Sequence, residues 1–259
     1  MPIMQQLILK IPLPVLGLIF VGVAVIYSTA GVLAVRHFVH PNRLKIHHDI
    51  ADPMLGAVAA VYSVLIAFVV ITVWISFDKS NSNVQLEANY LADIYRDSEG
   101  LSADFHQKVA KILQEYRQAV IDYEWKTMAR GEMSPEVEQL MKQIWMLYTT
   151  YQPKTPTEQS FFDESVRKLN SFRELRRQRL MDARSGIEPL LWFVLIVGGL
   201  STVSLTFFFG TENIKAHIIM AALLSLTISL ILFTIMEMDY PFTGSVAISP
   251  ESFKMILLD

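Results

Sequence analysis

Residues 53–77 read PMLGAVAAVYSVLIAFVVITVWISF, a stretch without Asp, Glu, Lys or Arg. A bilayer core of about 30 Å needs about 20 helical residues, which this stretch supplies. Three further stretches free of these four residue types are long enough, namely residues 11–35, 189–211 and 216–236. Backbone polar groups cannot stay unpaired in lipid, and none of the four stretches shows the period-two alternation of a barrel strand. We therefore predict four transmembrane helices in two hairpins.

The composition agrees with a membrane protein and excludes several classes of function. The chain is 52% hydrophobic and only 18% charged, with a mean hydropathy of +0.36, whereas soluble domains carry nearer 25% charged residues. A net charge of −3 gives no basic surplus, so we expect no nucleic-acid partner. The absence of cysteine excludes disulfides, thiolate catalysis and Cys-based metal centres, and we expect no cofactor.

Charge is concentrated between the second and third apolar stretches. Residues 78–188 hold 16 of the 22 Lys and Arg residues and 18 of the 25 Asp and Glu residues. Within this insert, apolar residues recur at steps of three and four, which is typical of amphipathic helices. The series are Phe105, Val109, Ile112, Leu113, Tyr116 and Val120; Val137, Leu140, Met141, Ile144 and Tyr148; and Phe162, Val166, Leu169, Phe172 and Leu175. The predicted class is all-α.

The chain therefore divides into four parts: an N-terminal transmembrane hairpin (1–77), a water-facing helical insert (78–188), a second hairpin (189–236) and a C-terminal tail (237–259). Val84, Leu86, Leu91 and Ile94 continue the second span, and the last series of the insert leads to the third span. We expect both inner spans to extend out of the membrane as long helices.

Proline and glycine mark the expected helix boundaries. Asp52-Pro53 and Glu188-Pro189 each place an N-cap residue before a first-turn proline, which predicts the starts of the second and third spans. Gly131 to Pro135 and Pro153 to Pro156 predict loops inside the insert. Ser28-Thr29-Ala30 resembles a signal-peptide cleavage site, but the apolar run before it is longer than a signal peptide requires.

The charges near the membrane give conflicting indications of orientation. Arg36, Arg43 and Lys45 favour a cytoplasmic first loop, whereas five arginines crowd the approach to the third span on the insert side. These are Arg173, Arg176, Arg177, Arg179 and Arg184. Their larger number predicts that the insert and both termini are cytoplasmic in a multi-pass protein of the cell membrane, the inner membrane in a Gram-negative bacterium.

Three clusters of polar residues are candidates for chemistry, and each has a simpler explanation. His47-His48-Asp49, with His40 and Asp52 nearby, could supply metal ligands. Adjacent histidines chelate poorly, so we expect no metal and interpret the segment as a polar loop. Glu237 and Asp239 follow the fourth span and could form an ion-attracting ring in an oligomer, although a carboxylate at a helix end is usually solvated. The Arg173–Arg184 run could grip an anionic lipid or ligand, or form a solvated face of salt bridges.

Several classes of transport protein are disfavoured by the absence of charged residues from the predicted spans. None contains Asp, Glu, Lys or Arg, whereas proton pumps and many ion-coupled transporters need an ionisable group inside the membrane. A transporter would have to use hydroxyls such as those of Ser201, Thr202, Ser204, Ser225 and Ser229, which more often pack helices. No catalytic or nucleotide-binding motif is present, and we do not expect an enzyme. A pore with a dry apolar constriction, or a membrane-anchored scaffold, remains.

Several segments, taken in order, resemble one family. Residues 63–70 (SVLIAFVV), running on to Trp74 and Phe77, are similar to the pore helix of the bestrophin channels. Residues 239–244 (DYPFTG) resemble the Asp-Pro-Phe-Gly element that follows the last bestrophin span. With Glu124-Trp125 and the arginine run, the chain resembles the prokaryotic bestrophin-like domain family, which is distantly similar to the bestrophin ion channels.

The resemblance implies a ring-shaped homo-oligomer, such as a pentamer, that passes small inorganic ions across the lipid bilayer. Bestrophins narrow the pore with three apolar side chains on the second span, and the matching positions are Ala60, Val64 and Phe68, with Thr72 one turn further on. The acidic cluster that binds calcium in animal bestrophins is replaced here by residues 245–251 (SVAISPE), so we expect no calcium site. The alternative is a non-conducting sensor or assembly scaffold that binds a partner through the insert.

Overall fold

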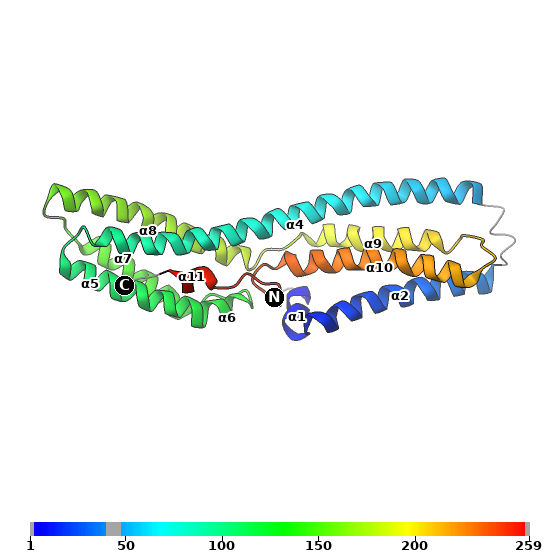
Figure 1. The fold of residues 1–259 in the computed structure, drawn as a ribbon, viewed down its shortest axis with the longest axis horizontal. Helices are drawn as coiled ribbons and strands as arrows, with labels where there is room; N and C mark the ends of the chain where they lie inside the picture. The colour runs from blue at the N-terminus through cyan, green and yellow to red at the C-terminus, as the bar shows by residue number, and fades with distance from the viewer. Residues whose placement is uncertain (1–2, 40–47, 257–259) are drawn as a thin grey trace. The chain divides into compact units, whose positions relative to one another are not determined.

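A computed structural model describes residues 3–39 and 48–256, and within them the chain is helical with no strand. The helices are α1 (Ile3–Lys10), α2 (Leu13–Phe38), α4 (His48–Ser98), α5 (Ala103–Ala119), the π-helix η1 (Val120–Glu124), α6 (Trp125–Met128), α7 (Pro135–Thr150), α8 (Pro156–Asp182), α9 (Pro189–Thr206), α10 (Ile214–Asp239) and α11 (Glu251–Met255). Figure 1 shows these elements along the chain.

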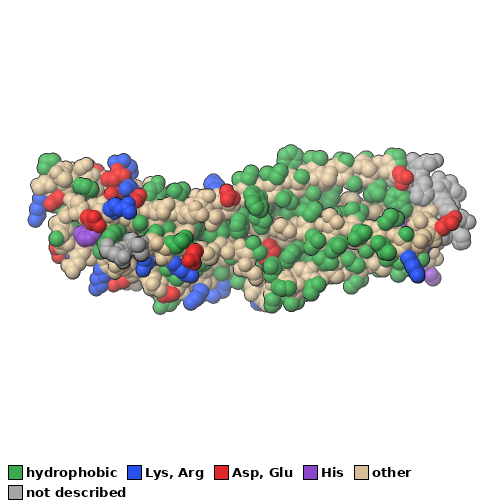
Figure 2. All heavy atoms as spheres, in the orientation of Figure 1, with side chains coloured by type: hydrophobic (Ala, Val, Ile, Leu, Met, Phe, Trp, Pro, Cys, Tyr) green, Lys and Arg blue, Asp and Glu red, His purple; other side chains and the backbone are tan. Residues whose placement is uncertain are grey.

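The contacts divide the chain into two compact units. We call the first the insert unit; it comprises the residues up to Leu9, Ser76–Ser185 and the residues from Tyr240 onward. The second is the membrane unit, Lys10–Ile75 with Gly186–Asp239. Figure 2 shows hydrophobic side chains covering the visible face of the membrane unit, whereas Lys, Arg, Asp and Glu side chains gather over the insert unit.

Four helices of the described chain are long and apolar enough to cross a membrane: α2, α4 from Asp52 onward, α9 and α10. In the membrane unit α2 packs along α10, and small residues allow the close approach. Gly17 lies under the ring of Phe233, and the Ser225 hydroxyl donates a 2.6 Å hydrogen bond to the carbonyl of Ala24. The predicted all-α class with four membrane-spanning helices is therefore confirmed.

The helix α4 continues the second span far beyond the apolar stretch, as its sequence predicts. Beyond the apolar stretch, Val84, Leu91 and Ile94 are buried in the core of the insert unit. Its start was predicted wrongly: α4 begins at His48, and Pro53 lies inside the helix. Pro53 has no N–H, so it removes one early backbone hydrogen bond from α4.

The third span, by contrast, is not continuous with the insert. Helix α8 ends at Asp182 and α9 begins at Pro189, with turn and bend residues between them. Proline at the first position of α9 has no N–H to donate to a preceding turn, and Gly186 adds backbone freedom. The expectation of one long helix is therefore wrong here, whereas the predicted start at Pro189 is confirmed.

The core of the insert unit is built from the predicted amphipathic faces. The innermost side chains of α5, α7 and α8, such as Val109, Ile144 and Phe172, are fully buried. The segment after α10 joins this core, since Phe242 and Phe253 are buried in it. The Trp125 indole donates a 2.9 Å hydrogen bond to the carbonyl of Ile248. Residues 240–256 are thus part of the folded insert unit.

Candidate functional site

The four predicted constriction residues lie on one side of α4 and are exposed in the single chain. Val64 is 56% and Phe68 is 67% exposed, and Ala60 and Thr72 are exposed as well. The hydroxyls on this side are satisfied within the helix. The Thr72 hydroxyl donates to the Phe68 carbonyl at 2.8 Å, and the Ser63 hydroxyl donates to the Ala60 carbonyl at 2.9 Å. This side of α4 therefore offers mostly apolar groups.

The opposite side of α4 is packed inside the membrane unit. Tyr62, Ile66, Val69 and Val73 are buried there. The Tyr62 hydroxyl donates a 3.0 Å hydrogen bond to the carbonyl of Leu195 on α9. Its ring lies against Gly198 so closely that an added Cβ would be 2.7 Å from it. Helix α4 is thus held by one face, while its other face is left without a partner among the residues that the structure describes.

The exposed face extends beyond the four predicted residues. Large or small apolar side chains are exposed at alternating steps of three and four along the whole span, at Met54, Ala57, Val61, Val64, Phe68, Ile71 and Ile75. We call these seven residues the α4 stripe. Steps of three and four keep side chains on one face of a helix, and the same spacing forms the seam between packed helices. The sequence reasoning found only part of this face.

The two carboxylates at the end of α10 are buried in the described structure. The Asp239 carboxylate accepts hydrogen bonds from the Ile187 backbone N–H at 2.7 Å and from the Trp192 indole at 3.3 Å. Glu237 is only 4% exposed, and neither carboxylate oxygen has a hydrogen-bond partner among the described residues. Asp239 thereby fixes the start of α9. That the pair forms an ion-attracting ring stays a prediction.

The hydroxyls that a transporter would need are used for packing. Thr202 and Ser204 donate to carbonyls four residues earlier in α9, at 2.8 and 2.6 Å. The Ser225 hydroxyl bonds to α2 and that of Ser229 bonds to the Leu226 carbonyl at 2.9 Å. Ser201 is exposed. These contacts agree with helix packing.

The arginine run before the third span divides into buried and exposed members. Arg179 is fully buried and Arg176 is 5% exposed, whereas Arg173, Arg177 and Arg184 are exposed. The Arg176 guanidinium donates to the Glu124 carboxylate at 2.6 Å and to Glu138 at 2.8 Å. The interpretation of the run as one solvated face is therefore wrong for two of its five arginines, since their side chains turn into the core.

Glu124 joins these arginines to a second buried pair. Arg179 donates to Glu124 at 2.8 Å and also holds Glu87 of α4. Burial would raise the pKa of Glu124, but Arg179 and Arg176 outweigh it and lower that pKa below its ordinary value. We call Glu87, Glu124, Arg176 and Arg179 the buried ion cluster.

A turn of π-helix presents Glu124 to the buried ion cluster. The turn spans Val120–Glu124 between α5 and α6, and both end residues are buried. A π turn accommodates one extra residue in a helix, and such turns frequently occur at functional sites. Tyr116, Val120 and Glu124 follow one another at steps of four, and all three side chains are fully buried.

The histidine-rich metal candidate lies outside the residues whose side chains the structure describes, apart from Asp52. Among the described residues no group of three His, Cys, Asp or Glu side chains is placed to hold a metal ion.

Comparison with known proteins identifies the family. The sequence model of a protein family, the bestrophin-like domain, matches residues 22–253. The chain belongs to the bestrophin-like family. The bestrophin-like fold is also seen in the crystal structure of a point mutant of a bacterial bestrophin homolog from Klebsiella pneumoniae. The TM-score is 0.63 at 10% sequence identity, over 91% of this chain and 94% of that one. No curated protein matches the chain.

The family and its fold, which the sequence predicts, are thus confirmed, and the chain is a membrane protein. The buried ion cluster of this bestrophin-like chain was missed by the sequence reasoning. A signal for it exists: Leu169, Phe172, Arg176 and Arg179 follow one another at steps of three and four. The two arginines therefore continue the apolar face of α8, which a reading by charge alone overlooks.

Proposed function

We propose that this protein is a homo-oligomeric ion channel of the cell membrane that conducts small inorganic ions passively, with the exposed face of α4, which includes the α4 stripe, lining its pore. The constriction is formed by Ala60, Val64, Phe68 and Thr72. The similarity of the fold to a protein described as a bestrophin homolog supports the proposal.

The observation that carries the proposal is the exposed apolar face of a helix that is firmly packed on its other side. Val61 is 74% exposed in the middle of the span, whereas Tyr62 beside it is only 7% exposed. Lipid would accept such a face, but the unbroken three-and-four spacing over seven residues favours a face that meets copies of itself. A ring of copies would surround its axis with the side chains of Val64 and Phe68.

An apolar ring in a pore gates by excluding water. Because residues 53–77 carry no charged side chain and the hydroxyls nearest the constriction bond to their own helix, ions would find no binding group there. Passive conduction through a constriction that wets and dewets agrees with these features. Active transport agrees less well, because it requires an ionisable group that moves between two sides.

Recording from the purified protein in a planar bilayer tests the proposal. Replacing Phe68 by Ala should increase the open probability or the unitary conductance, since a smaller ring wets more easily. The matched control is Leu18→Ala on α2, which removes similar apolar volume from a side chain 72% exposed. Leu18→Ala should leave the conductance unchanged.

The alternative is a membrane-anchored sensor or scaffold that conducts nothing. It would be favoured if neither the natural protein nor Phe68→Ala conducts, or if Phe68→Ala and Leu18→Ala have the same effect. The size of the detergent-solubilised particle, measured by light scattering, separates a ring of several copies from a monomer.

A further inference from the structure

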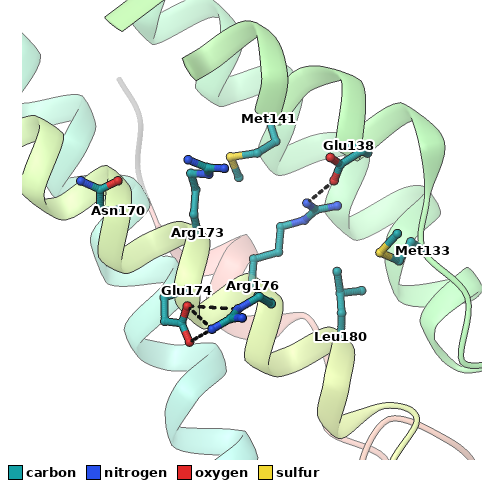
Figure 3. A pocket seen from close by; sticks show the side chains of 9 residues that line it. Met133, Glu138, Met141, Asn170, Arg173, Glu174, Arg176 and Leu180 are labelled. Atoms are coloured by element: carbon teal, nitrogen blue, oxygen red, sulfur yellow. Dashed lines mark hydrogen bonds and ion pairs between the residues drawn. The ribbon is translucent and has the colours of Figure 1, made fainter. Parts of the chain in front are cut away.

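A cavity of about 360 Å³ lies between α7 and α8 in the insert unit. Its lining combines arginines, glutamates, an amide and apolar side chains: Met133, Glu138, Met141, Asn170, Arg173, Glu174, Arg176, Arg177 and Leu180. Figure 3 shows Arg173 and Arg176 reaching from α8 towards α7, where Met141 and Glu138 lie. The volume is at the lower end of the range for small-molecule sites.

One of the three arginines that line this cavity has no carboxylate beside it in the described part of the chain. Glu174 is already paired with Arg177 through hydrogen bonds as short as 2.6 Å, and Glu138 is paired with Arg176. Arg173 has no ion pair and no hydrogen bond among the residues that the structure describes. Arg173 is thus the one arginine lining the cavity that has no carboxylate in contact among the described residues, so its N–H groups are free to receive an anion.

The side chain of Arg173 is also held in place by a contact within the insert unit. Its guanidinium carbon lies 4.6 Å from the centre of the Trp145 ring, a cation–π distance that restrains the side chain. The N–H groups of Arg173 make no hydrogen bond with the described residues, and a guanidinium matches a carboxylate or phosphate group in a two-point contact. The amide of Asn170, also without a hydrogen bond among the described residues, lies one turn away on α8.

The rest of the cavity is apolar. Apolar surface is supplied by Met133, Met141 and Leu180. The flexible side chain of methionine can adapt to ligands of different shape. We propose that the cavity binds a small organic anion, with its carboxylate or phosphate on Arg173 and Asn170 and its apolar part against these three side chains. The proposal concerns the insert unit alone and does not depend on whether the spans conduct ions.

Binding there would reach the buried ion cluster through Arg176. This side chain lines the cavity, where it holds Glu138, and its other edge holds Glu124 at 2.6 Å. An anion beside Arg173 competes with Glu138 for positive charge and so changes the partners of Arg176. Glu124 in turn shares Arg179 with Glu87 of α4, so the contacts from the cavity to α4 are continuous.

The test is isothermal titration of the full-length protein in a neutral detergent with two probes, octanoate and octyl phosphate. Arg173→Gln should weaken binding of the probe at least about tenfold, because it removes a charge-assisted two-point contact. Arg167→Gln is the matched control, since Arg167 lies on the same helix and pairs with Glu164 at the surface. This control should bind as the natural protein does.

Glu138→Gln should have the opposite effect on the affinity for the probes. It removes the competing carboxylate from the cavity while keeping its size, so the same probes should bind more tightly, by about threefold or more. Saturable binding that is lost in Arg173→Gln, kept in Arg167→Gln and strengthened in Glu138→Gln supports the site. Absence of saturable binding by either probe, or equal weakening by both arginine substitutions, overturns it.

The same oxyanion could belong to a soluble ligand or to a lipid headgroup. Nanodiscs of phosphatidylcholine with and without phosphatidylglycerol distinguish these sources. Competition of phosphatidylglycerol with octyl phosphate in the natural protein would identify a headgroup, and undiminished binding of octyl phosphate would identify a soluble anion. Conductance is measured in a separate experiment. A channel that lacks this site would conduct but bind neither probe, and a protein that has the site but is no channel would bind a probe without conducting.

Discussion

Arg179 and Glu87 lie 92 positions apart in the chain, yet their side chains form a two-point ion pair in the interior of the insert unit, with Nε–Oε2 and Nη2–Oε1 distances of 2.7 and 2.9 Å. Both side chains are fully buried. The Arg179 guanidinium also lies 5.0 Å from the ring centre of Trp125 and donates to Glu124. One arginine thus joins α8 to α4 and to the π turn.

Removing this arginine should destabilise the protein strongly. Arg179→Met keeps the apolar stem but leaves Glu87 and Glu124 buried with less compensation, and breaking a buried pair in this way costs about 3–5 kcal/mol of unfolding free energy. Arg177→Met, whose pair with Glu174 is exposed, should cost less than about 1 kcal/mol. Chemical unfolding of both variants in detergent, followed by tryptophan fluorescence, measures the difference. An equal loss of unfolding free energy in the two variants would show that the buried pair stabilises the protein no more than the exposed pair does.

Alkaline stability should depend on Tyr148. Burial raises the pKa of Tyr148 from 10.0 to about 12, and its hydroxyl lies 2.6 Å from that of Ser165. A raised folded-state pKa favours the neutral phenol, so the contribution is complete below pH 10 and is lost as the pH rises from 10 to about 12. The change amounts to roughly 3 kcal/mol.

Tyr148→Phe should therefore lose less stability than the natural protein between pH 10 and 12, while differing little in slope below pH 9. Unfolding midpoints measured across this range check the expectation. Parallel curves for the two proteins would contradict it, because the other groups that titrate here are common to both.

Close helix packing in the membrane unit makes Gly31 sensitive. A Cβ at Gly31 would run into the ring of Phe207, which is buried and in edge contact with Tyr27. Gly31→Ala should cost about 1–3 kcal/mol, the usual effect of overpacking. Gly22 on the same helix has nothing within 4 Å of its added Cβ, so Gly22→Ala is the control and should be nearly neutral. Thermal denaturation in detergent compares the two.

The orientation can be tested with single introduced cysteines, because the chain itself has no cysteine that would be labelled. Lys154→Cys lies in the loop between α7 and α8, and Lys215→Cys lies at the start of α10; both positions are exposed. If the insert is cytoplasmic, a membrane-impermeant maleimide should label Lys215→Cys in intact cells and Lys154→Cys only after permeabilisation. The reverse pattern would place the insert outside.

The sequence was sufficient for features set by composition and periodicity. The spans follow from long charge-free runs, and the core of the insert follows from apolar steps of three and four, as at Val109 and Leu113. Both signals are local, and each is repeated many times along the chain. Helix boundaries depended on single residues: proline at 189 starts a helix, whereas the proline at 53 lies within one.

Features that depend on distant partners could not be predicted. Nothing near Arg179 in the sequence shows that Glu87 will meet it, and a charge run is usually solvated. Likewise, Ile248 gives no local sign that its carbonyl will receive the Trp125 indole. The α4 stripe was found in part because a family resemblance pointed to two of its positions, Val64 and Phe68, whereas its full length becomes evident only when the buried face around Tyr62 is known.

The π turn at Val120–Glu124 has a consequence for how this region tolerates change. Deleting one residue, such as Ile121, would restore an ordinary α-helical hydrogen-bond ladder and so improve the segment considered alone. It would also change the local backbone that presents Glu124 to Arg176 and Arg179. In this segment the less regular backbone is the one that fits the whole protein, so single-residue deletions should be far more damaging here than in the loop at Gly131.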